Sequence, residues 1–224
     1  MSSFAVTPLN RVMRLRQRGH YDRDTVFRIL AVPHAIAHVA WNDDDGLPVC
    51  LPMLFGVAEA QDLLYLHGSI ANNMLGTIGE RGQRVCVTVT VLDAWVLAKS
   101  LFHSSANYRS VVLFCTPEEL SDDDEKLRAL TLISERALPG RSAEARAPTK
   151  AELKATSVLK LRIDAASAKV RNEGVSEPES DRKDAALANV WSGTVPIVTT
   201  LGTPVKDEAS NTNRDAPLPG FLQN

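Results

Sequence analysis

The chain has 224 residues, of which 44% are apolar and 23% charged, and its formal net charge is -2 at pH 7. This composition is typical of a globular protein with a buried core, and it excludes the strongly basic surface of a general nucleic-acid-binding protein. No apolar run reaches the length of a membrane span and no signal peptide precedes the fold, so we expect a cytoplasmic protein without membrane or nucleic-acid partners.

The cysteines Cys50, Cys86 and Cys115 each lie in an apolar, strand-like run. An odd number of cysteines without a CxxC spacing argues against a disulfide framework or a zinc site. We therefore predict reduced, buried thiols and no metal site.

Residues 1–9 are expected to be a flexible leader, followed by an arginine cluster at residues 11, 14, 16 and 18. This cluster fits either a phosphate-binding arm or a solvated basic face, and its composition alone favours the solvated face. A helix then begins near Asp22 or Asp24, either of which is a good N-cap, and Pro33 ends it. The spacing of its apolar residues predicts a buried face made by Val26, Phe27, Ile29 and Leu30.

Alternating residues 34–41 and 49–54 predict two strands joined by a turn at residues 42–46, where Gly46 permits the turn geometry. His34 and His38 would share a strand face, and we interpret them as core or rim histidines rather than metal ligands. A third strand is predicted at residues 62–66, and His67-Gly68-Ser69 would turn into a helix over residues 70–79. The free N–H groups of that helix would suit an anion.

Residues 84–115 form the central stretch. Two β-rich runs, 85–91 and 111–114, are predicted to be buried strands, and the region between them is too long and too polar for a simple hairpin turn. Its many donors indicate an anion or cofactor cradle, or alternatively a solvated connection. Trp95 would stack on a planar ligand or pack in the core.

The remaining chain predicts a helix over residues 120–138 capped by Ser121, a short helix capped by Thr149, and a strand over residues 158–171. Lys169 and Arg171 lie two apart on that strand and would point the same way, either to clamp a phosphate or carboxylate or to protect an edge. Residues 172–183 are predicted to be a mobile loop, residues 190–199 a last strand, and residues 202–224 an arm or disordered tail.

Several ordered motifs in this sequence resemble those of the flavin-nucleotide-binding branch of the pyridoxamine 5′-phosphate oxidase-like family. They are NRVMRLRQRGHYDRDTV (10–26), LYLHGS (64–69), Asp93 with VLAKSLFH (96–103), NYRSVV (107–112) and SAKVR (167–171). The resemblance implies an FMN-binding split β-barrel, mainly β with flanking helices (α+β). It also implies one domain over residues 10–201 and a homodimer with FMN at its interface. The ending PLPGFLQN lacks the arginine-rich end of pyridoxamine 5′-phosphate oxidase itself, so that enzyme's own activity is not expected.

The resemblance and the residue chemistry together predict an oxidoreductase that acts on a small molecule by flavin chemistry. His103 and Tyr108 are the predicted proton donors. The predicted cofactor-binding residues are His67, Ser69, Asn73, Lys99, Ser105, Asn107, Arg109, Lys169, Arg171 and Trp191.

Asn73 departs from the family, in which a basic residue usually lies at this position. Loss of a charge-assisted contact to phosphate is worth about 1.5–3 kcal/mol. Two alternatives to a flavin-dependent oxidoreductase therefore stay open: a flavin-free isomerase or cyclase that uses the same pocket, and a non-catalytic flavin or haem carrier. A haem carrier would need an axial ligand from His20, His34, His38, His67 or His103.

Overall fold

A computed structural model describes residues 2–71, 73–207, 209 and 217–222, with only the backbone described at residues 73, 74, 76, 81 and 221. The described structure is mainly antiparallel β with a few helices, which confirms the expected fold class. Its contacts divide the chain into two compact units. The first unit comprises Met1–Leu51, Val85–Cys115 and Asp164–Val198, and the second comprises Pro52–Arg84, Thr116–Ile163 and Thr199–Asn224.

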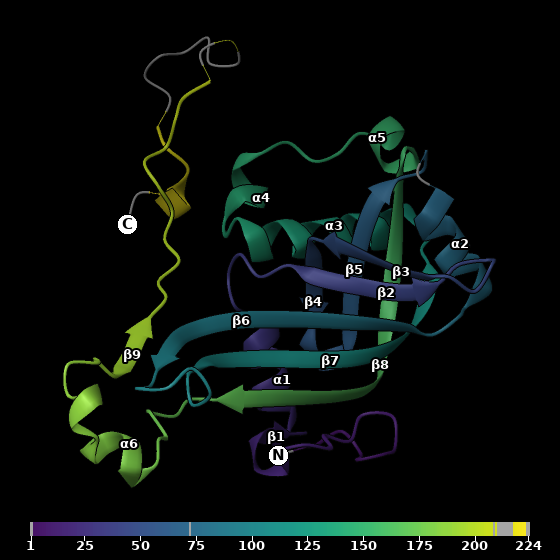
Figure 1. Cartoon of the computed structure of the whole chain (residues 1–224). Helices are drawn as coiled ribbons and strands as arrows, with labels where there is room; N and C mark the ends of the chain where they lie inside the picture. The colour runs from purple at the N-terminus through teal and green to yellow at the C-terminus, as the bar shows by residue number, and fades with distance from the viewer. Residues whose placement is uncertain (1, 72, 208, 210–216, 223–224) are drawn as a thin grey trace. The chain divides into compact units, whose positions relative to one another are not determined.

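The first unit is built on neighbouring strands in the order β3-β2-β6-β7-β8, of which β6, β7 and β8 lie side by side in Figure 1. Two short strands extend it, because β1 pairs with β8 and β9 pairs with β6. The bounds are β1 (Gly19–His20), β2 (Ala37–Asn42), β3 (Pro48–Met53), β6 (Val85–Leu97), β7 (Ser105–Glu119), β8 (Thr156–Arg171) and β9 (Gly193–Pro196). The last residues of β3 and of β7 and the first half of β8 belong to the second unit.

The helix α1 (Arg23–Leu30) lies against β6. Asp22 is its N-cap and accepts a hydrogen bond of 2.8 Å from the Thr25 backbone N–H. The predicted apolar face is confirmed, since Val26, Phe27, Ile29 and Leu30 are all buried. On β6, alternate residues (85, 87 and 89) are buried, while Cys86 and Thr88 are only half-buried. One face of this sheet therefore belongs to the core and the other is open.

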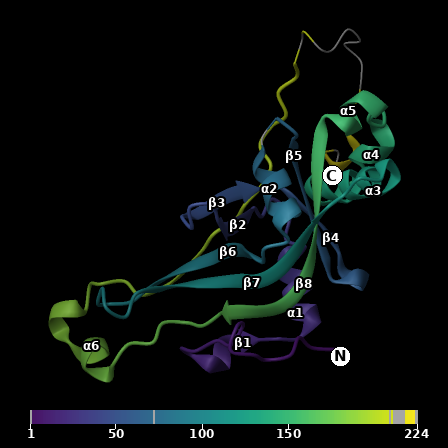
Figure 2. The same ribbon diagram turned by 90° about the vertical axis from the view of Figure 1, so that its right-hand side faces the viewer.

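The central stretch is a long hairpin, which contradicts the prediction of two short strands with a polar connection. Strand β6 continues to Leu97, β7 begins at Ser105, and only residues 98–104 form the turn (Figure 2). The strands continue because the alternation continues: Ala94 and Val96 are buried, whereas Trp95 is exposed. An irregularity in register between Leu92 and Ala94 accommodates the extra residue Asp93.

The hairpin of β2 and β3 begins later than predicted. His34 has φ 63°, a left-handed conformation that strands do not use, so β2 starts at Ala37 and the two histidines do not share a strand face. Gly46 has φ 78° in the turn, as predicted.

All three cysteines are free thiols, but only Cys115 is buried. Cys86 is half-buried and Cys50 is exposed, which corrects the expectation for those two.

The second unit contains β4 (Phe55–Ala58), β5 (Leu63–Ser69) and the first half of β8, paired in the order β4-β5-β8. The long helix α3 (Asp123–Ala137) packs against β4 and β5. Its Ala129 and Ile133 share a buried cluster with Tyr65, Leu120 and Val158. Shorter helices are η2 (Glu59–Gln61), α2 (Asn73–Arg81), α4 (Arg141–Glu144), α5 (Lys150–Lys154) and η4 (Gly220–Leu222).

Several local predictions in this unit need correction. The N-cap of α3 is Asp122, not Ser121, because the Asp122 carboxylate accepts a 2.8 Å bond from the Glu125 backbone N–H. The HGS motif still belongs to β5, since its backbone pairs with β8 through Ser69, and the helix predicted over residues 70–79 is present but runs from Asn73 to Arg81. The Thr149 cap is confirmed as a full capping box.

Short helices interrupt the regions predicted to be irregular. The N-terminal segment contains η1 (Arg16–Arg18), and the predicted loop over residues 172–183 contains α6 (Glu179–Lys183), followed by η3 (Ala185–Leu187). Strand β9 is shorter than predicted. Part of the predicted tail, residues 208, 210–216 and 223–224, lies outside the described residues. No helix in the described part of the chain is long and apolar enough to cross a membrane.

Candidate functional site

The predicted site residues fall into two groups, one in each unit. His67, Ser69 and Asn73 belong to the second unit, and the other predicted residues belong to the first.

In the second unit, His67 lies on β5 and its Nδ1 atom is buried without a hydrogen-bond partner among the described residues. Burial lowers the pKa of this imidazole, so His67 is neutral at neutral pH. Ser69 is exposed at the end of β5, where its hydroxyl accepts a 3.2 Å bond from the Ala71 backbone N–H. Asn73 begins α2, but its side chain lies outside the described part, so its phosphate contact stays a prediction.

In the first unit, Lys99 holds a later segment of the chain. Its backbone N–H donates to the Glu177 carboxylate at 2.8 Å, and its ammonium donates to the carbonyl oxygens of Leu187 and Val190 at 2.6 and 3.0 Å. We call residues 172–192 the cover segment. The ammonium that was predicted to bind a cofactor therefore holds the cover segment in place.

Asn107 and Arg171 bind the start of the cover segment. Arg171 is only 5% exposed, and its guanidinium donates to the Asn107 Oδ1 atom at 2.5 Å. The Asn107 amide also donates to the Glu173 carbonyl oxygen at 3.0 Å. Arg18 donates two bonds, of 2.9 and 2.6 Å, to the Glu173 carboxylate, and this pairing lowers the Glu173 pKa.

The two predicted proton donors occupy different places. His103 lies in the turn, where its Nδ1 atom is 2.7 Å from the Ser100 hydroxyl and 3.8 Å from an Asp181 carboxylate oxygen. Tyr108 is half-buried within β7 opposite Leu92. No hydrogen bond joins His103 to Tyr108 in the described structure, so the site does not bring them together as an acid–base pair.

Arg109 is paired within the chain. Its guanidinium donates to both oxygens of Asp93, with the shortest distance 2.7 Å, and this bonding raises the Arg109 pKa. Both partners are motif residues of the resemblance. Because the carboxylate neutralises it, Arg109 does not offer a free positive charge to a phosphate.

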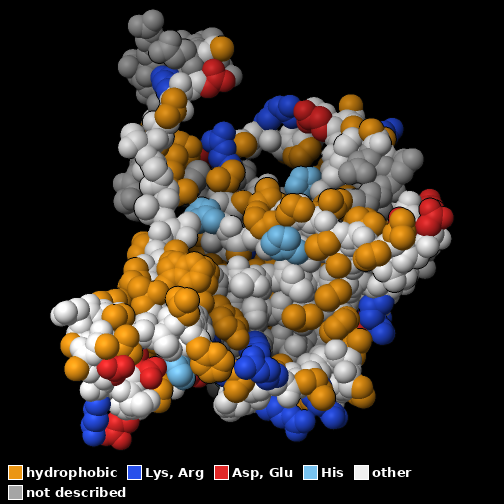
Figure 3. Space-filling view, viewed as in Figure 1, with side chains coloured by type: hydrophobic (Ala, Val, Ile, Leu, Met, Phe, Trp, Pro, Cys, Tyr) orange, Lys and Arg blue, Asp and Glu red, His pale blue; other side chains and the backbone are white. Residues whose placement is uncertain are grey.

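An exposed aromatic surface lies where β6 pairs with β9. Trp95, opposite Val195, is 50% exposed and Trp191 is 61% exposed. Gly193 leaves room for the Trp191 ring as it lies here, since a Cβ atom at this position would be 2.7 Å from the ring and would make it shift. Figure 3 shows an orange patch over this region of β6 and β9. Both tryptophans were predicted from the sequence, but Gly193 was missed because its contact depends on the ring position.

Ser105 and Lys169 complete the first group. Ser105 is exposed at the start of β7 opposite Val96. Lys169 is half-buried and lines a separate cavity of about 250 Å³ beneath residues 9–12. Lys169 and Arg171 were predicted to point the same way and to clamp one phosphate or carboxylate. They do not share such a site, because the Arg171 side chain is buried and bonded to Asn107. Trp95 and Trp191 are thus the exposed predicted residues of the β6–β9 surface, and their indole faces have the chemistry to stack on a planar ring system, whereas Ser105 pairs with the buried Val96 and lies on the other face of the sheet.

Comparisons with known proteins agree with this fold. Residues 22–170 match the family model described as pyridoxamine 5′-phosphate oxidase. The flavocytochrome Anf3 from Azotobacter vinelandii is 30% identical with a TM-score of 0.82, over 96% of this chain and 95% of that one. The FAD and haem binding protein from Mycobacterium smegmatis is 36% identical with a TM-score of 0.80, over 92% and 95%. No curated protein matches the sequence.

Proposed function

Because the chain belongs to the pyridoxamine 5′-phosphate oxidase family, we propose that it is a redox protein that binds both a flavin nucleotide and a haem. The observation that carries this proposal is the similarity, over almost the full chain, to a flavocytochrome and to an FAD and haem binding protein. Both of these names join a flavin to a haem.

The flavin nucleotide is proposed to be FAD rather than the FMN expected from the motifs. The Mycobacterium smegmatis relative, at 36% identity, is named for FAD. The chain also lacks the basic residue at Asn73 that the FMN-binding resemblance predicts. Comparing the affinities for the two nucleotides tests this choice directly.

The aromatic surface is the part of the first unit that fits a planar ring. Trp95 and Trp191 expose their indoles, and Gly193 leaves the space in which the Trp191 ring lies. An exposed tryptophan gains stability when a flat apolar ligand covers it. These residues would bind and orient the ring, and the Tyr108 hydroxyl is a donor that β7 supplies on the same face as Trp95.

For the haem, His67 is the histidine whose environment best suits an axial ligand. Its Nδ1 atom is buried and without a partner among the described residues, and its lowered pKa keeps the imidazole neutral. A neutral imidazole is the form that binds iron. When bound, the haem would supply one-electron chemistry and the flavin one- and two-electron chemistry. The protein's own residues would hold these groups and shield them from water.

We further propose that the chain forms a homodimer. Beside the two tryptophans, the first unit exposes Leu97, Val195 and Ile197. Exposed apolar surface of this kind is typical of an interaction site, and a second copy would bury it. Molar mass from light scattering tests this: a mass of twice 24.4 kDa supports the dimer, and a mass of 24.4 kDa contradicts it.

The proposal is tested by titrating the purified chain with FAD, FMN and haemin in separate experiments. We expect a dissociation constant in the micromolar range or below for FAD and for haemin. His67→Ala should abolish the sharpened, shifted Soret band that distinguishes bound from free haemin but retain flavin binding, whereas Ala substitutions at His20, His34, His38 and His103 should keep that band. Loss of the band in one of those four instead would contradict the assignment of His67.

Two outcomes would redirect the function. Binding of FMN alone would support the simpler flavin-dependent oxidoreductase that acts on a small molecule. A protein that binds neither flavin nor haemin at millimolar concentration would contradict the redox proposal and favour the flavin-free isomerase or cyclase.

A further inference from the structure

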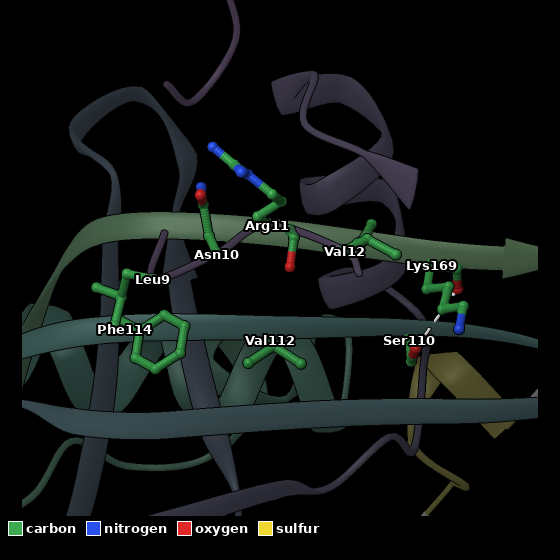
Figure 4. A pocket seen from close by; sticks show the side chains of 10 residues that line it. Leu9, Asn10, Arg11, Val12, Ser110, Val112, Phe114 and Lys169 are labelled. Carbon is green, nitrogen blue, oxygen red and sulfur yellow. Dashed lines mark hydrogen bonds between the residues drawn. The ribbon is translucent and has the colours of Figure 1, made fainter. Parts of the chain in front are cut away.

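The cavity under the N-terminal segment is formed entirely within the first unit. Its volume is about 250 Å³, and it is lined by three short stretches: residues 9–12, alternate residues of β7, and residues 167–169 of β8. Figure 4 shows Phe114, Val112 and Ser110 in a row along β7. Leu9 lies near Phe114 at one end of this row, and Lys169 lies near Ser110 at the other.

One end of the cavity is cationic and rich in hydroxyl groups. The Lys169 ammonium has no hydrogen bond or ion pair within the described part of the chain. Ser110 donates only a long bond of 3.4 Å, to the Lys169 carbonyl oxygen, so its hydroxyl is free to turn towards a ligand. Ser167 is only 7% exposed, and its hydroxyl has no partner among the described residues. The hydroxyl oxygen is not one of the fully buried polar atoms among the described residues, so it stays accessible and can donate to a bound anion.

The other end of the cavity is apolar. Leu9, Val112 and Phe114 line it, Val12 lies nearer to Lys169, and no carboxylate is among the lining residues. Arg11 also borders the cavity, but its guanidinium points away from the β7 side chains in Figure 4. The cavity therefore has an apolar end and a positively charged end.

Residues 9–12, which line one side of the cavity, are fixed by hydrogen bonds. Asn10 is 3% exposed, and its amide donates to the carbonyl oxygens of Ala5 and Ala166, both at 2.9 Å. The Val12 backbone N–H donates to the Tyr21 hydroxyl at 2.8 Å. Residues 9–12 are thus fixed over β8 by buried hydrogen bonds, so the cavity is formed before any ligand binds.

We propose that this cavity binds a small amphipathic anion. Its carboxylate or phosphate would accept hydrogen bonds from Lys169, Ser110 and Ser167, and its apolar body would lie on Val112 and Phe114. The volume limits the ligand to about one ring or a short alkyl chain. This site is additional to the proposed flavin and haem sites and does not depend on them, and it assigns Lys169 to this anion instead of to the flavin.

The experiment titrates the full-length protein with phenyl phosphate, benzoate and inorganic phosphate, followed by calorimetry or by NMR shifts. We expect phenyl phosphate or benzoate to bind at least tenfold more tightly than inorganic phosphate, because the apolar floor adds burial. The better of the two aromatic anions identifies a phosphate or a carboxylate ligand. Lys169→Met should weaken that binding about tenfold, since it removes a charge-assisted hydrogen bond.

Arg16→Met is the matched control, because Arg16 is an exposed cation of the same N-terminal segment and does not line the cavity. It should leave the affinity unchanged. Equal weakening by Lys169→Met and Arg16→Met would show a diffuse basic surface and overturn the proposal. Equal affinities for inorganic phosphate and the aromatic anions, or no binding of any probe at millimolar concentration, would also overturn it.

Discussion

The helix α3 packs on the strands β4 and β5, whereas the cover segment is bonded to residues at the ends of β6, β7 and β8, and the two are held by different forces. In the second unit, α3 is held by apolar contact: Ile133 is buried, and a Cβ atom on Gly56 would lie 2.8 Å from the Ile133 backbone nitrogen. Even the Arg136 guanidinium packs 3.6 Å above the Phe55 ring, and burial lowers its pKa to about 10. In the first unit, the cover segment is held by Lys99, Asn107 and Arg171 through hydrogen bonds.

This difference predicts that α3 and the cover segment respond differently: α3 unfolds only with its unit, whereas the cover segment can open locally. Apolar packing is lost only when the core is disrupted, so α3 should unfold together with its unit. Apart from the buried Arg171–Asn107 bond, the polar contacts of the cover segment are partly exposed and individually weak, so the segment should open while the sheet stays folded. Residues predicted from motifs to hold a cofactor are therefore also the residues that hold a movable part of the chain.

The largest expected effect on the free energy of unfolding is for the apolar contacts of α3. Ile133→Ala should lower the free energy of unfolding by about 3 kcal/mol, because it leaves a cavity between α3 and the sheet. Leu132→Ala, on the exposed side of the same helix, should cost well under about 1 kcal/mol. Urea denaturation measures both changes. Equal losses would show that α3 is not held by its buried face.

Gly56→Ala should follow, with a loss of about 2 kcal/mol. The new methyl group would contact the α3 backbone, which has less freedom to move than a side chain, so α3 must shift away from β4. Gly174→Ala is the control, since nothing lies within 4 Å of a Cβ atom there. A neutral result for Gly56→Ala would contradict the close packing of α3 on β4.

On the polar side, Arg171→Met should cost about 1–2 kcal/mol in overall stability, because it removes the hydrogen bonds of a buried cation. Its main effect should be local: hydrogen exchange of the cover segment should rise about tenfold, while exchange in α3 stays unchanged. Lys183→Met, which removes an exposed pair with Glu179, should change neither. A uniform rise throughout the chain would instead indicate global destabilisation.

The smallest effect is a pH dependence of the cover segment. Pairing with Arg18 holds the Glu173 pKa below its usual value of 4.5, so this contact stabilises the segment above that value. The stabilisation is lost as the pH falls below 4.5 through the folded-state pKa. Cleavage of the segment by pepsin should accelerate over this range in the wild-type protein. The Glu173→Gln variant should be cleaved faster above this range and should show less of the acceleration.

The sequence was informative where structure depends on neighbouring residues. The buried face of α1 follows from the spacing of Val26, Phe27, Ile29 and Leu30, and the Thr149 cap follows from its own hydroxyl. Contacts between distant residues were not predictable. The Lys99 ammonium meets carbonyl oxygens 88 and 91 positions later, and the cavity combines three separate stretches of the chain. The motifs identified the right neighbourhood, but most of its charges proved to be bound within the chain.

The central claim is that the chain binds both a flavin nucleotide and a haem. It is tested most directly by the absorption spectrum of the protein as purified from cells grown with riboflavin and a haem precursor. The account predicts both the visible bands of an oxidised flavin and a Soret band, with the Soret band absent from His67→Ala prepared in parallel. A wild-type protein without both sets of bands, which also fails to acquire them when FAD and haemin are added, would contradict it.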